Sequence, residues 1–278
     1  MGWGSYATVV LLWLIEIDNL VNCIAATFFF FWSVYWLLHF LAIAYAKLAL
    51  HKKAKVDPEK PRPGVSIIKP LLGVDSNLAS NLESFFLLEY PVFELLFCVQ
   101  SDSDPALMLI KTMVEKYPHI DSRILIGGKD VGLNPKINNM MPAYEACMYN
   151  VILVSDAGVR MKPDTLEDMI GSLKDSVGIV TQMPYCCDRK GFAATLEKVY
   201  FGTAHARIYL SADALGFVCS TGMSSLMRKA VLDEAGGFAA FGQYLAEDYF
   251  FAQAISSRQV FFLLSVLCLL YLHLYFII

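Results

Sequence analysis

The sequence is poor in charged residues, which fill only 17% of its 278 positions, whereas hydrophobic residues fill 56%. Soluble domains usually carry about 25% charged residues, and the mean hydropathy of +0.50 excludes a disordered chain. Residues 19–46 lack Asp, Glu, Lys and Arg, and residues 260–278 carry His273 as their single acidic or basic side chain. These two uncharged stretches exclude a simple soluble globule and leave an ordinary domain between two apolar ends. The length of the chain fits one large domain or two small ones.

The sequence also lacks an excess of positive charge and the cysteine spacings of metal sites. Its formal net charge is −4 and its pI is about 5.7, whereas nucleic-acid binding needs a basic surface. The seven cysteines include no CxxC pair, so neither a zinc site nor a disulfide framework is indicated. We therefore expect no nucleic-acid partner and a middle domain in a reducing, cytosolic compartment.

Residues 19–46 are long enough to cross a membrane, because about 20 apolar residues span the hydrocarbon core as a helix. No Lys or Arg precedes Lys47, and Lys52, Lys53 and Lys55 follow it. The positive-inside rule then places the N-terminus outside or in the lumen and the middle domain in the cytosol. A cleaved signal peptide is disfavoured, since the run is too long and has no basic residue before it.

The C-terminal apolar run is just long enough for a second span. It also fits a re-entrant segment, a truncated piece of a longer hydrophobic region, or a tail without native structure. Composition divides the chain into a membrane anchor at 1–50, a basic and Pro-rich linker at 51–63, a domain at 64–258 and a hydrophobic tail at 260–278.

The middle domain alternates between strand and helix patterns. Short apolar runs predict strands at 65–68, 93–99, 123–126, 151–154 and 177–181. Helical spacing predicts helices at 78–88, 105–115, 134–147 and 163–173. This alternation predicts an α/β fold with a mostly parallel sheet and helices on both faces. Ligands of such folds bind beyond the carboxyl ends of the strands, which directs attention to residues 100–104, 127–139 and 155–160.

Acidic residues follow two of the predicted strands. Asp156 precedes small residues, and a carboxylate placed there can hold a divalent cation against a ligand phosphate. A plain turn accounts for the same residues. Asp102 and Asp104 suit a contact to a nucleotide base or ribose, and Asp104 also suits a cap for the next helix.

Three further residues suit polar roles. Lys136 opens a predicted helix, where backbone N–H groups favour a phosphate, although a solvated lysine is the alternative. Asp248 follows Glu247 in an apolar, aromatic stretch, and burial there would raise the pKa of a carboxyl group and make it a usable base. A surface helix with acidic residues in its first turn is the alternative. His205 is a candidate polar contact, although a lone histidine is more often structural.

Five phrases of the sequence resemble the ceramide glucosyltransferase family. They lie at residues 65–73, 126–139, 187–202, 219–229 and 246–251. The resemblance covers about residues 36–258, and it implies a glycosyltransferase A-type domain that faces the cytosol on a Golgi membrane. It further implies UDP-glucose as donor, ceramide as acceptor and a divalent cation, Mg²⁺ or Mn²⁺.

The resemblance also implies roles for the candidate residues. Asp156 matches the family's second acidic motif, which serves the metal and the diphosphate. Asp248 matches the third motif, the catalytic base that takes the proton from the primary hydroxyl of ceramide, and direct displacement then inverts the donor linkage. Lys136 adds positive charge for the departing UDP. His205 and Cys219 match positions near the donor site.

Two features depart from the family pattern. The family has an Asp directly after the Val-Gln that ends the second strand, but Ser101 stands there, so Asp102 or Asp104 would have to replace it. No Trp follows Trp36 and no Arg follows Arg258, so the Gln/Arg-x-x-Arg-Trp motif is absent. Losing a cation that stabilises transition-state charge lowers rates by orders of magnitude. We therefore expect a truncated or alternatively spliced form with weak or no activity.

Two other functions stay open. One is a non-catalytic membrane protein that binds nucleotide sugar, forms a homo-oligomer or associates with a full-length enzyme. The other is a membrane glycosyltransferase with a different lipid or polysaccharide acceptor, which the long matching phrases disfavour. Transfer of glucose from UDP-glucose to ceramide distinguishes the three.

Overall fold

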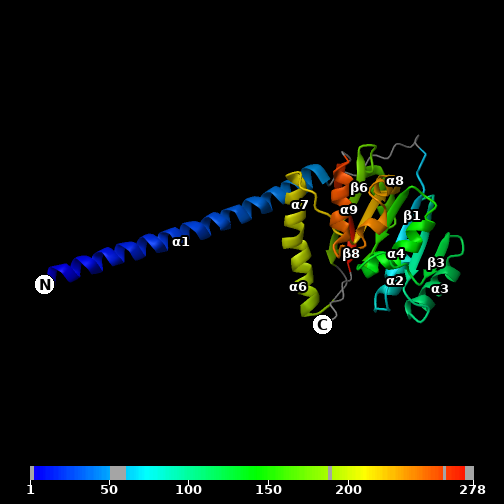
Figure 1. Ribbon diagram of the computed structural model, residues 1–278, viewed down its shortest axis with the longest axis horizontal. Helices are drawn as coiled ribbons and strands as arrows, with labels where there is room; N and C mark the ends of the chain where they lie inside the picture. Colours follow the sequence, from blue (N-terminus) through cyan, green and yellow to red (C-terminus); the bar gives the residue numbers. More distant parts are fainter. Residues whose placement is uncertain (1–2, 51–60, 187–189, 259–260, 273–278) are drawn as a thin grey trace.

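The computed structural model describes residues 3–50, 61–186, 190–258 and 261–272. A long helix, α1 (Trp3–Tyr45), projects from a domain in which helices surround one sheet (Figure 1). A π-helical segment, η1 (Ala46–Leu50), continues it. Residues 51–60, most of the predicted linker, lie outside the described residues.

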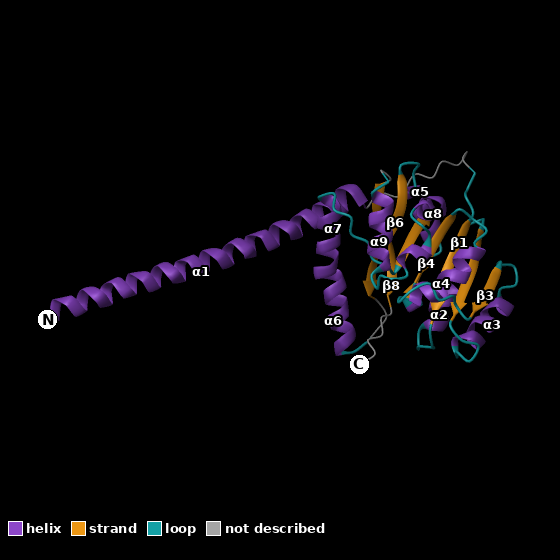
Figure 2. Ribbon diagram, viewed as in Figure 1, coloured by secondary structure: helices purple, strands orange, loops and turns teal. Residues whose placement is uncertain are grey.

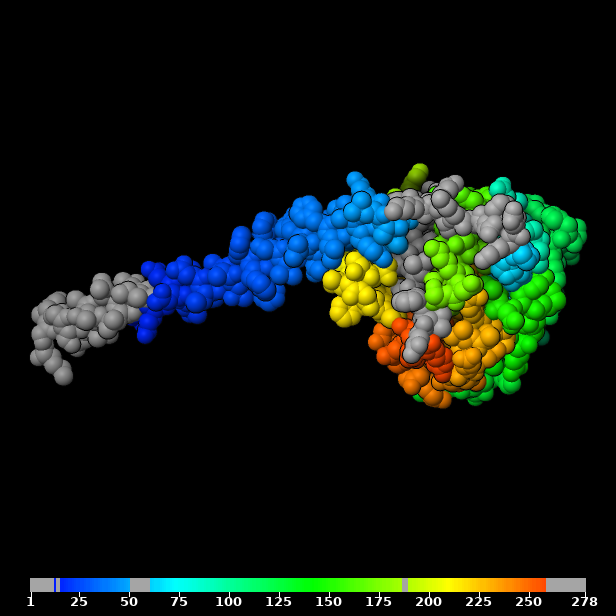
Figure 3. All heavy atoms as spheres, turned by 90° about the horizontal axis from the view of Figure 1, so that it is seen from above, coloured from blue at the N-terminus to red at the C-terminus, as the bar shows by residue number. Residues whose placement is uncertain are grey.

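Helix α1 carries the membrane segment expected from the sequence. In the described part of the chain, one helix is long and apolar enough to cross a membrane, over Glu16–Leu50. Side chains in its middle stand free of the domain, as the 72% exposure of Phe28 and the 64% exposure of Phe31 show. Figure 3 shows the same helix leaving the domain at one end. Apolar side chains exposed along the middle of a long helix are suited to lipid, and this helix indicates a membrane protein.

The described strands form one eight-stranded sheet in the order β3-β2-β1-β4-β7-β6-β8-β5 (Figure 2). Their bounds are β1 Val65–Leu71, β2 Phe93–Val99, β3 Ser122–Ile126, β4 Val151–Ser155, β5 Val159–Arg160, β6 Val177–Cys186, β7 Ser224–Arg228 and β8 Phe261–Leu272. Strands β3, β2, β1 and β4 run parallel, as the alternating pattern predicts. Strand β7 runs antiparallel to both β4 and β6, so the second half of the sheet is mixed.

Helices cover both faces of this sheet. Helices α2 (Leu78–Phe86), α3 (Ala106–Lys116) and α5 (Thr165–Ser172) pack on one face, and α4 (Pro135–Ala146), α8 (Lys229–Glu234) and α9 (Glu247–Ser256) pack on the other. Side chains of a strand alternate between faces: Leu95 and Phe97 of β2 join the first core, whereas Leu96 and Cys98 join the second. The predicted α/β class with helices on both faces is confirmed.

The part of the chain after β6 was not predicted from local patterns. Helix α6 (Phe192–Tyr200), the π-helical turn η2 (Phe201–His205) and helix α7 (Ala206–Ala214) follow one another between β6 and β7. The short 3-10 helix η3 (Phe238–Phe241) precedes α9. Strand β8 pairs parallel with β6 and antiparallel with β5. The described part of the apolar tail is therefore a strand, not the helix of a second span; residues 273–278 lie outside the described residues.

Candidate functional site

The start of helix α4 places Lys136 at the carboxyl edge of the parallel strands. Asn134 caps the helix, because its Oδ1 accepts hydrogen bonds from the N–H groups of Lys136 (2.9 Å) and Ile137 (3.3 Å). Pro135 follows at the first helical position, where its missing N–H removes no hydrogen bond. The cap thus fixes Lys136 in the first turn, where its side chain extends toward the loop after β4.

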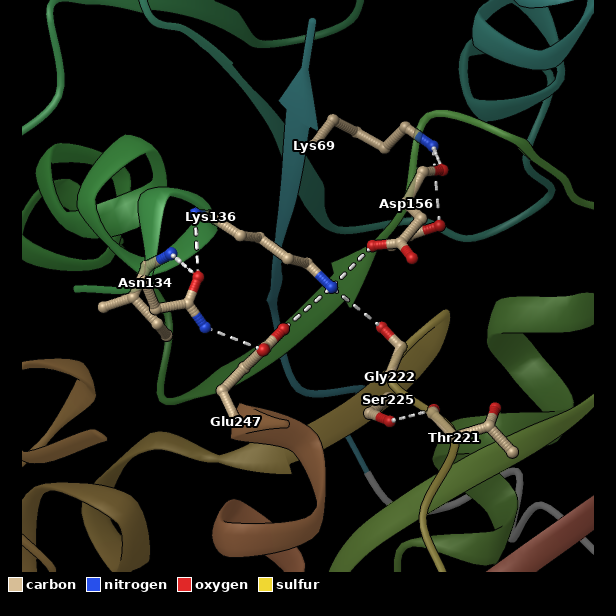
Figure 4. Close-up of polar contacts among 10 residues, drawn as sticks. Lys69, Asn134, Lys136, Asp156, Thr221, Gly222, Ser225 and Glu247 are labelled. Atoms are coloured by element: carbon tan, nitrogen blue, oxygen red, sulfur yellow. Dashed lines mark hydrogen bonds and ion pairs between the residues drawn. The ribbon is translucent and has the colours of Figure 1, made fainter. Parts of the chain in front are cut away.

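Lys136 joins three chain segments through its ammonium group (Figure 4). Its Nζ lies 2.8 Å from Oδ1 of Asp156, 2.9 Å from Oε1 of Glu247 and 3.3 Å from the carbonyl oxygen of Gly222. Burial alone would lower the pKa of Lys136, but the two carboxylates outweigh it and raise that pKa. Asn134 Nδ2 donates to Oε2 of Glu247 at 2.9 Å. The loop after β4 and the first turn of α9 therefore form one site.

Lys69 supports this site through the backbone of Asp156. It lies in β1 between Ile68 and Pro70 and is fully buried, and its Nζ donates to the backbone oxygen of Asp156 at 2.6 Å. The ammonium also lies 3.9 Å from the centre of the Phe85 ring. Burial lowers the pKa of Lys69 to about 7, and the Asp156 carboxylate opposes that shift only in part. Lys69 thus fixes the backbone that carries Asp156.

Asp248 lies beside Glu247 at the start of α9. Burial raises the pKa of the Asp248 carboxyl group, the neighbouring charge of Glu247 adds to this, and Lys136 and the Tyr249 N–H oppose it. Gly222 packs directly against Asp248, since a Cβ added to Gly222 would lie 2.9 Å from the Asp248 Cβ and 3.0 Å from its Cγ. The Asp248 carboxylate is therefore a stronger base than usual, and it packs against Gly222, which has no side chain to displace it.

Replacing Gly222 by Ala should therefore displace Asp248 and lower the rate of any reaction that uses it. Misplacing a reacting group by about 1 Å can lower rates by about a hundredfold. The matched control is Gly202→Ala, since a Cβ at Gly202 has no neighbour within 4 Å among the described residues. Steady-state kcat of the two variants measures the effect, and equal rates would contradict the proposed contact.

His205 and Cys219 meet through Tyr209. The rings of His205 and Tyr209 stack with centroids 4.2 Å apart, and the Tyr209 hydroxyl hydrogen-bonds both the Cys219 thiol and, at 3.3 Å, the backbone oxygen of Ser220. Burial raises the pKa of the Cys219 thiol, the Tyr209 hydrogen bond opposes this, and the charge of Asp248 adds to it. The structure thus brings His205 and Cys219 into one group on the Asp248 side of the site.

The burial of His205 has a consequence for stability. The side chain is 6% exposed, and burial lowers its pKa from 6.5 to about 4. Between pH 6.5 and about 4, His205 is protonated in the unfolded chain but neutral in the folded chain. The free energy of unfolding therefore falls as the pH falls through this range. The loss should approach about 3 kcal/mol near pH 4.

Denaturant unfolding of wild type and His205→Phe between pH 7.5 and 4 measures this effect. Phe suits the site, because the rings of Tyr200, Phe201 and Tyr209 surround it. The stability difference between the two proteins should be constant above pH 7 and should shift in favour of the variant on acidification. Parallel pH profiles down to pH 4 would show that His205 does not stay neutral.

The other two predicted acids lie differently. The Asp104 carboxylate accepts hydrogen bonds from the N–H of Gly73 (3.1 and 3.0 Å) and from that of Ala106 (2.8 Å). It ties the loop after β1 to the first turn of α3, which is the capping role considered for it. Asp102 lies exposed in the turn between β2 and α3. Whether either residue contacts a nucleotide stays a prediction.

The protein side of this site offers a metal ion one carboxylate ligand, Asp156. No group of three His, Cys, Asp or Glu within the described residues is arranged to hold a metal. Asp156 is accessible, at 35% side-chain exposure, and Lys136 contacts only its Oδ1. Mg²⁺ in enzymes is often held by one or two carboxylates together with substrate phosphates and water. The site therefore fits a cation that arrives with a phosphorylated ligand.

Sequence comparison identifies the family. The model of glycosyl transferase family 21 matches residues 34–268. The chain belongs to this family. Ceramide glucosyltransferase 1 of Caenorhabditis elegans is 51% identical over 230 residues, which cover 82% of this chain and 49% of that protein. Ceramide glucosyltransferase 3 of the same organism is 50% identical over 242 residues, which cover 86% of this chain and 52% of that protein. The chain thus spans about half the length of these curated relatives.

Solved structures share the fold of this family 21 chain. A mannosyltransferase from Pyrobaculum calidifontis in complex with GDP-Man and Mn²⁺ superposes with a TM-score of 0.63 at 17% identity, over 86% of this chain and 64% of that one. Glucosyl-3-phosphoglycerate synthase from Mycobacterium tuberculosis superposes with a TM-score of 0.51 at 14% identity, over 77% and 72%. The glycosyltransferase A-like fold expected from the resemblance is confirmed.

Sequence reasoning missed two residues of this candidate site. Glu247 was considered only as one of two carboxylates in an apolar stretch and not as a site residue, but it forms the second ion pair of Lys136. Lys69 was not singled out, although a charged residue inside the apolar run 65–71 was the available signal. Among the predicted site residues, the structure joins Lys136 to Asp156 directly and His205 to Cys219 through Tyr209.

Proposed function

We propose that this chain binds UDP-glucose at the Asp156–Lys136 edge and transfers the glucosyl group, at a low rate, to the primary hydroxyl of ceramide with inversion. The observation that carries the proposal is the pair of ion pairs of Lys136, which bring Asp156 and the first turn of α9 into one site. Its relatives named as ceramide glucosyltransferases support both the glucosyl group and the acceptor. Because the chain covers about half of those relatives, activity, donor and acceptor are all proposals.

Asp248 is the base in this scheme. Its carboxylate accepts the proton of the ceramide hydroxyl while that oxygen forms a bond to the anomeric carbon of glucose, and the bond from that carbon to UDP breaks with its electron pair leaving on UDP. Attack opposite the leaving group converts an α-linked donor to a β-glucoside. Burial supports this role, because it raises the pKa of Asp248 and so strengthens it as a base.

Lys136 and Asp156 would stabilise the negative charge that develops on the leaving UDP, Lys136 directly and Asp156 through a bound cation. The Lys136 ammonium lies in the first turn of α4, at the positive end of the helix dipole, which favours an anionic ligand. A buried cation that is already fixed stabilises developing negative charge without reorganising. The free oxygen of Asp156 would hold Mg²⁺ or Mn²⁺, which would supply further positive charge to the diphosphate. His205, Cys219, Asp102 and Asp104 are proposed to lie around the donor.

The membrane side of the proposal follows from α1. We place the domain on the cytosolic side of the membrane, since the first Lys of the chain follows the helix at Lys47, and we place that membrane in the Golgi, as the resemblance to ceramide glucosyltransferases implies. A ceramide acceptor is itself a membrane lipid, so an anchored domain meets its substrate at the surface it is held to. Self-association, or association with a longer enzyme, remains a proposal of the same kind.

The test is product formation by the full 278-residue chain in lipid vesicles. UDP-glucose and ceramide are supplied with Mg²⁺ or Mn²⁺, the lipid product is separated, and its anomeric configuration is read by NMR. The proposal predicts a β-glucoside that is lost with EDTA. An α-glucoside would refute inversion, and UDP-glucose binding without any product would instead support a binding-only form.

A further inference from the structure

The segment α6–η2–α7 exposes a face that water-facing helices rarely show. Its large exposed side chains include Phe192 at 81%, Leu196 at 53%, Val199 at 55% and Ile208 at 53%. No charged residue is among the exposed residues from Gly191 to Ile208, and the charged residues of this stretch are half-buried. On a surface helix the exposed face normally carries the charges. An apolar exposed face of this length indicates a docking surface.

This docking face is held at the end of the candidate membrane helix. The Tyr45 hydroxyl donates to Oδ2 of Asp213 at 2.7 Å, and the Ser211 hydroxyl donates to the backbone oxygen of Leu38 at 2.9 Å. Figures 1 and 2 show α6 and α7 running across the direction of α1, at the side of the domain from which α1 leaves. A membrane crossed by α1 would therefore have its surface along α6 and α7.

The groove between α1 and α7 is lined by positive and polar groups. Its walls include His39 of α1, Lys47 of η1 and Arg207 of α7. The Arg207 Nη1 and His39 Nδ1 atoms are buried and have no hydrogen-bond partner among the described residues. The Arg207 guanidinium lies 4.0 Å from the centre of the Tyr35 ring, which fixes its position. Half-buried Arg207 and exposed Lys47 place two positive charges along one groove, so this groove suits an anionic group.

We propose that α6, η2 and α7 lie flat in the headgroup layer of the membrane that α1 crosses, with Arg207 and Lys47 bound to the phosphates of anionic lipids. The location selects this occupant, because aromatic residues of α1 beside the groove, Tyr35 and Trp36, are typical of the membrane–water interface. Basic residues at that depth meet the phosphates of the cytoplasmic leaflet. Amphipathic helices with an apolar face bind in this plane.

Such docking would bring the candidate site to the bilayer surface. The inner side of the same helical segment carries His205 and Tyr209, and Tyr209 hydrogen-bonds Cys219, whose pKa is influenced by Asp248. One helix diameter, about 10 Å, then separates the lipid from this part of the site. This consequence rests on the proposed function, whereas the docking itself does not.

Depth-dependent quenching tests the orientation. All four native tryptophans lie at or before Trp36, so a tryptophan added elsewhere is read by difference in the otherwise intact chain. In vesicles of phosphatidylcholine and phosphatidylglycerol, bromine-labelled lipid should quench Leu196→Trp strongly. The matched control is Met108→Trp, because Met108 is 68% exposed and Leu196 is 53% exposed. Met108 lies on α3, far from α1 in Figure 1, so this tryptophan should not be quenched. Equal quenching of both, or none of Leu196→Trp, would overturn the proposal.

Lipid selectivity tests the groove. Spin-labelled phosphatidylglycerol should associate with the chain in preference to spin-labelled phosphatidylcholine, and Arg207→Gln should reduce that preference by about fivefold. Lys47→Gln, at an exposed position whose loss should not affect folding, should act in the same direction. Lys111→Gln, on exposed α3, is the control and should change nothing. A preference unchanged in both groove variants would refute the headgroup contact. Neither measurement involves glucose transfer, so its failure would leave the proposed function standing.

Discussion

Asp248→Asn should abolish glucosyl transfer while UDP-glucose still binds. Asn has nearly the same shape and can still accept the hydrogen bond of the Tyr249 N–H, but it cannot take a proton from the acceptor hydroxyl. Removing a positioned base typically lowers rates by about a hundredfold to ten-thousandfold. The measurement is transfer from labelled UDP-glucose to ceramide by the chain in vesicles, alongside donor binding by calorimetry.

The stability of this variant separates chemistry from folding. The raised pKa of Asp248 means that its ionised form destabilises the folded state at neutral pH. Asp248→Asn should therefore unfold at the same denaturant concentration as wild type or a slightly higher one. Asp175→Asn, in the exposed turn before β6, is the matched control for both measurements. Retained transfer in Asp248→Asn, with unchanged stability, would remove Asp248 from the role of base.

Lys136→Met should lower both stability and donor binding. It removes the single cation between Asp156 and Glu247, and the Lys136 side chain is only 27% exposed while that of Glu247 is 8% exposed. Breaking a buried ion pair on one side typically lowers stability by about 3–5 kcal/mol, because the partner charge stays buried and unpaired. Denaturant unfolding measures this loss, and calorimetry with UDP-glucose measures the loss of binding.

Two further variants show whether the effect belongs to this network. Lys129→Met breaks an ion pair with Glu145 in which both side chains are about half exposed, and it should lower stability by less than about 1 kcal/mol. Adding Glu247→Gln to Lys136→Met should restore part of the stability, since it removes one of the unpaired charges. Losses that simply add, or that match the Lys129→Met loss, would contradict the coupling.

Local patterns predicted the parallel half of the sheet well. The strand expected at 93–99 has those same bounds in β2, because six of its seven residues are apolar and side chains on both faces are buried, which leaves little alternative. Helix α4 begins at Pro135, as its Asn-Pro start indicates. These elements are decided by side chains near one another in sequence, which is why the sequence alone sufficed.

The remainder depends on contacts that no local pattern contains. Strand β7 turns antiparallel after a long helical excursion through α6 and α7, and the direction of a strand after such an excursion depends on packing. The apolar run at 261–272 forms strand β8, although its hydrophobicity equally suited a membrane span. A continuous apolar run does not distinguish a buried strand from a helix.

The same division holds within the site. Lys136, Asp156 and Asp248 were found because each follows a local signal: a helix start, a strand end or an acidic pair. The second partner of Lys136, Glu247, lies 111 residues away in sequence and was not assigned to it. Lys69 was missed because the strand pattern is decided by its apolar neighbours, and its use emerges only once its ammonium is seen on the Asp156 backbone.

The most direct test of the donor site is calorimetric titration of the detergent-solubilised full chain with UDP-glucose and Mg²⁺, for wild type and Asp156→Asn. Asp156 meets Lys136 through Oδ1 and, in the proposed function, holds a cation with its other oxygen, so this substitution removes one side of the proposed donor site while leaving Asp248 in place. The proposed function predicts saturable binding by wild type that is lost or strongly weakened in Asp156→Asn. No binding by folded wild type, or equal binding by both proteins, would contradict it.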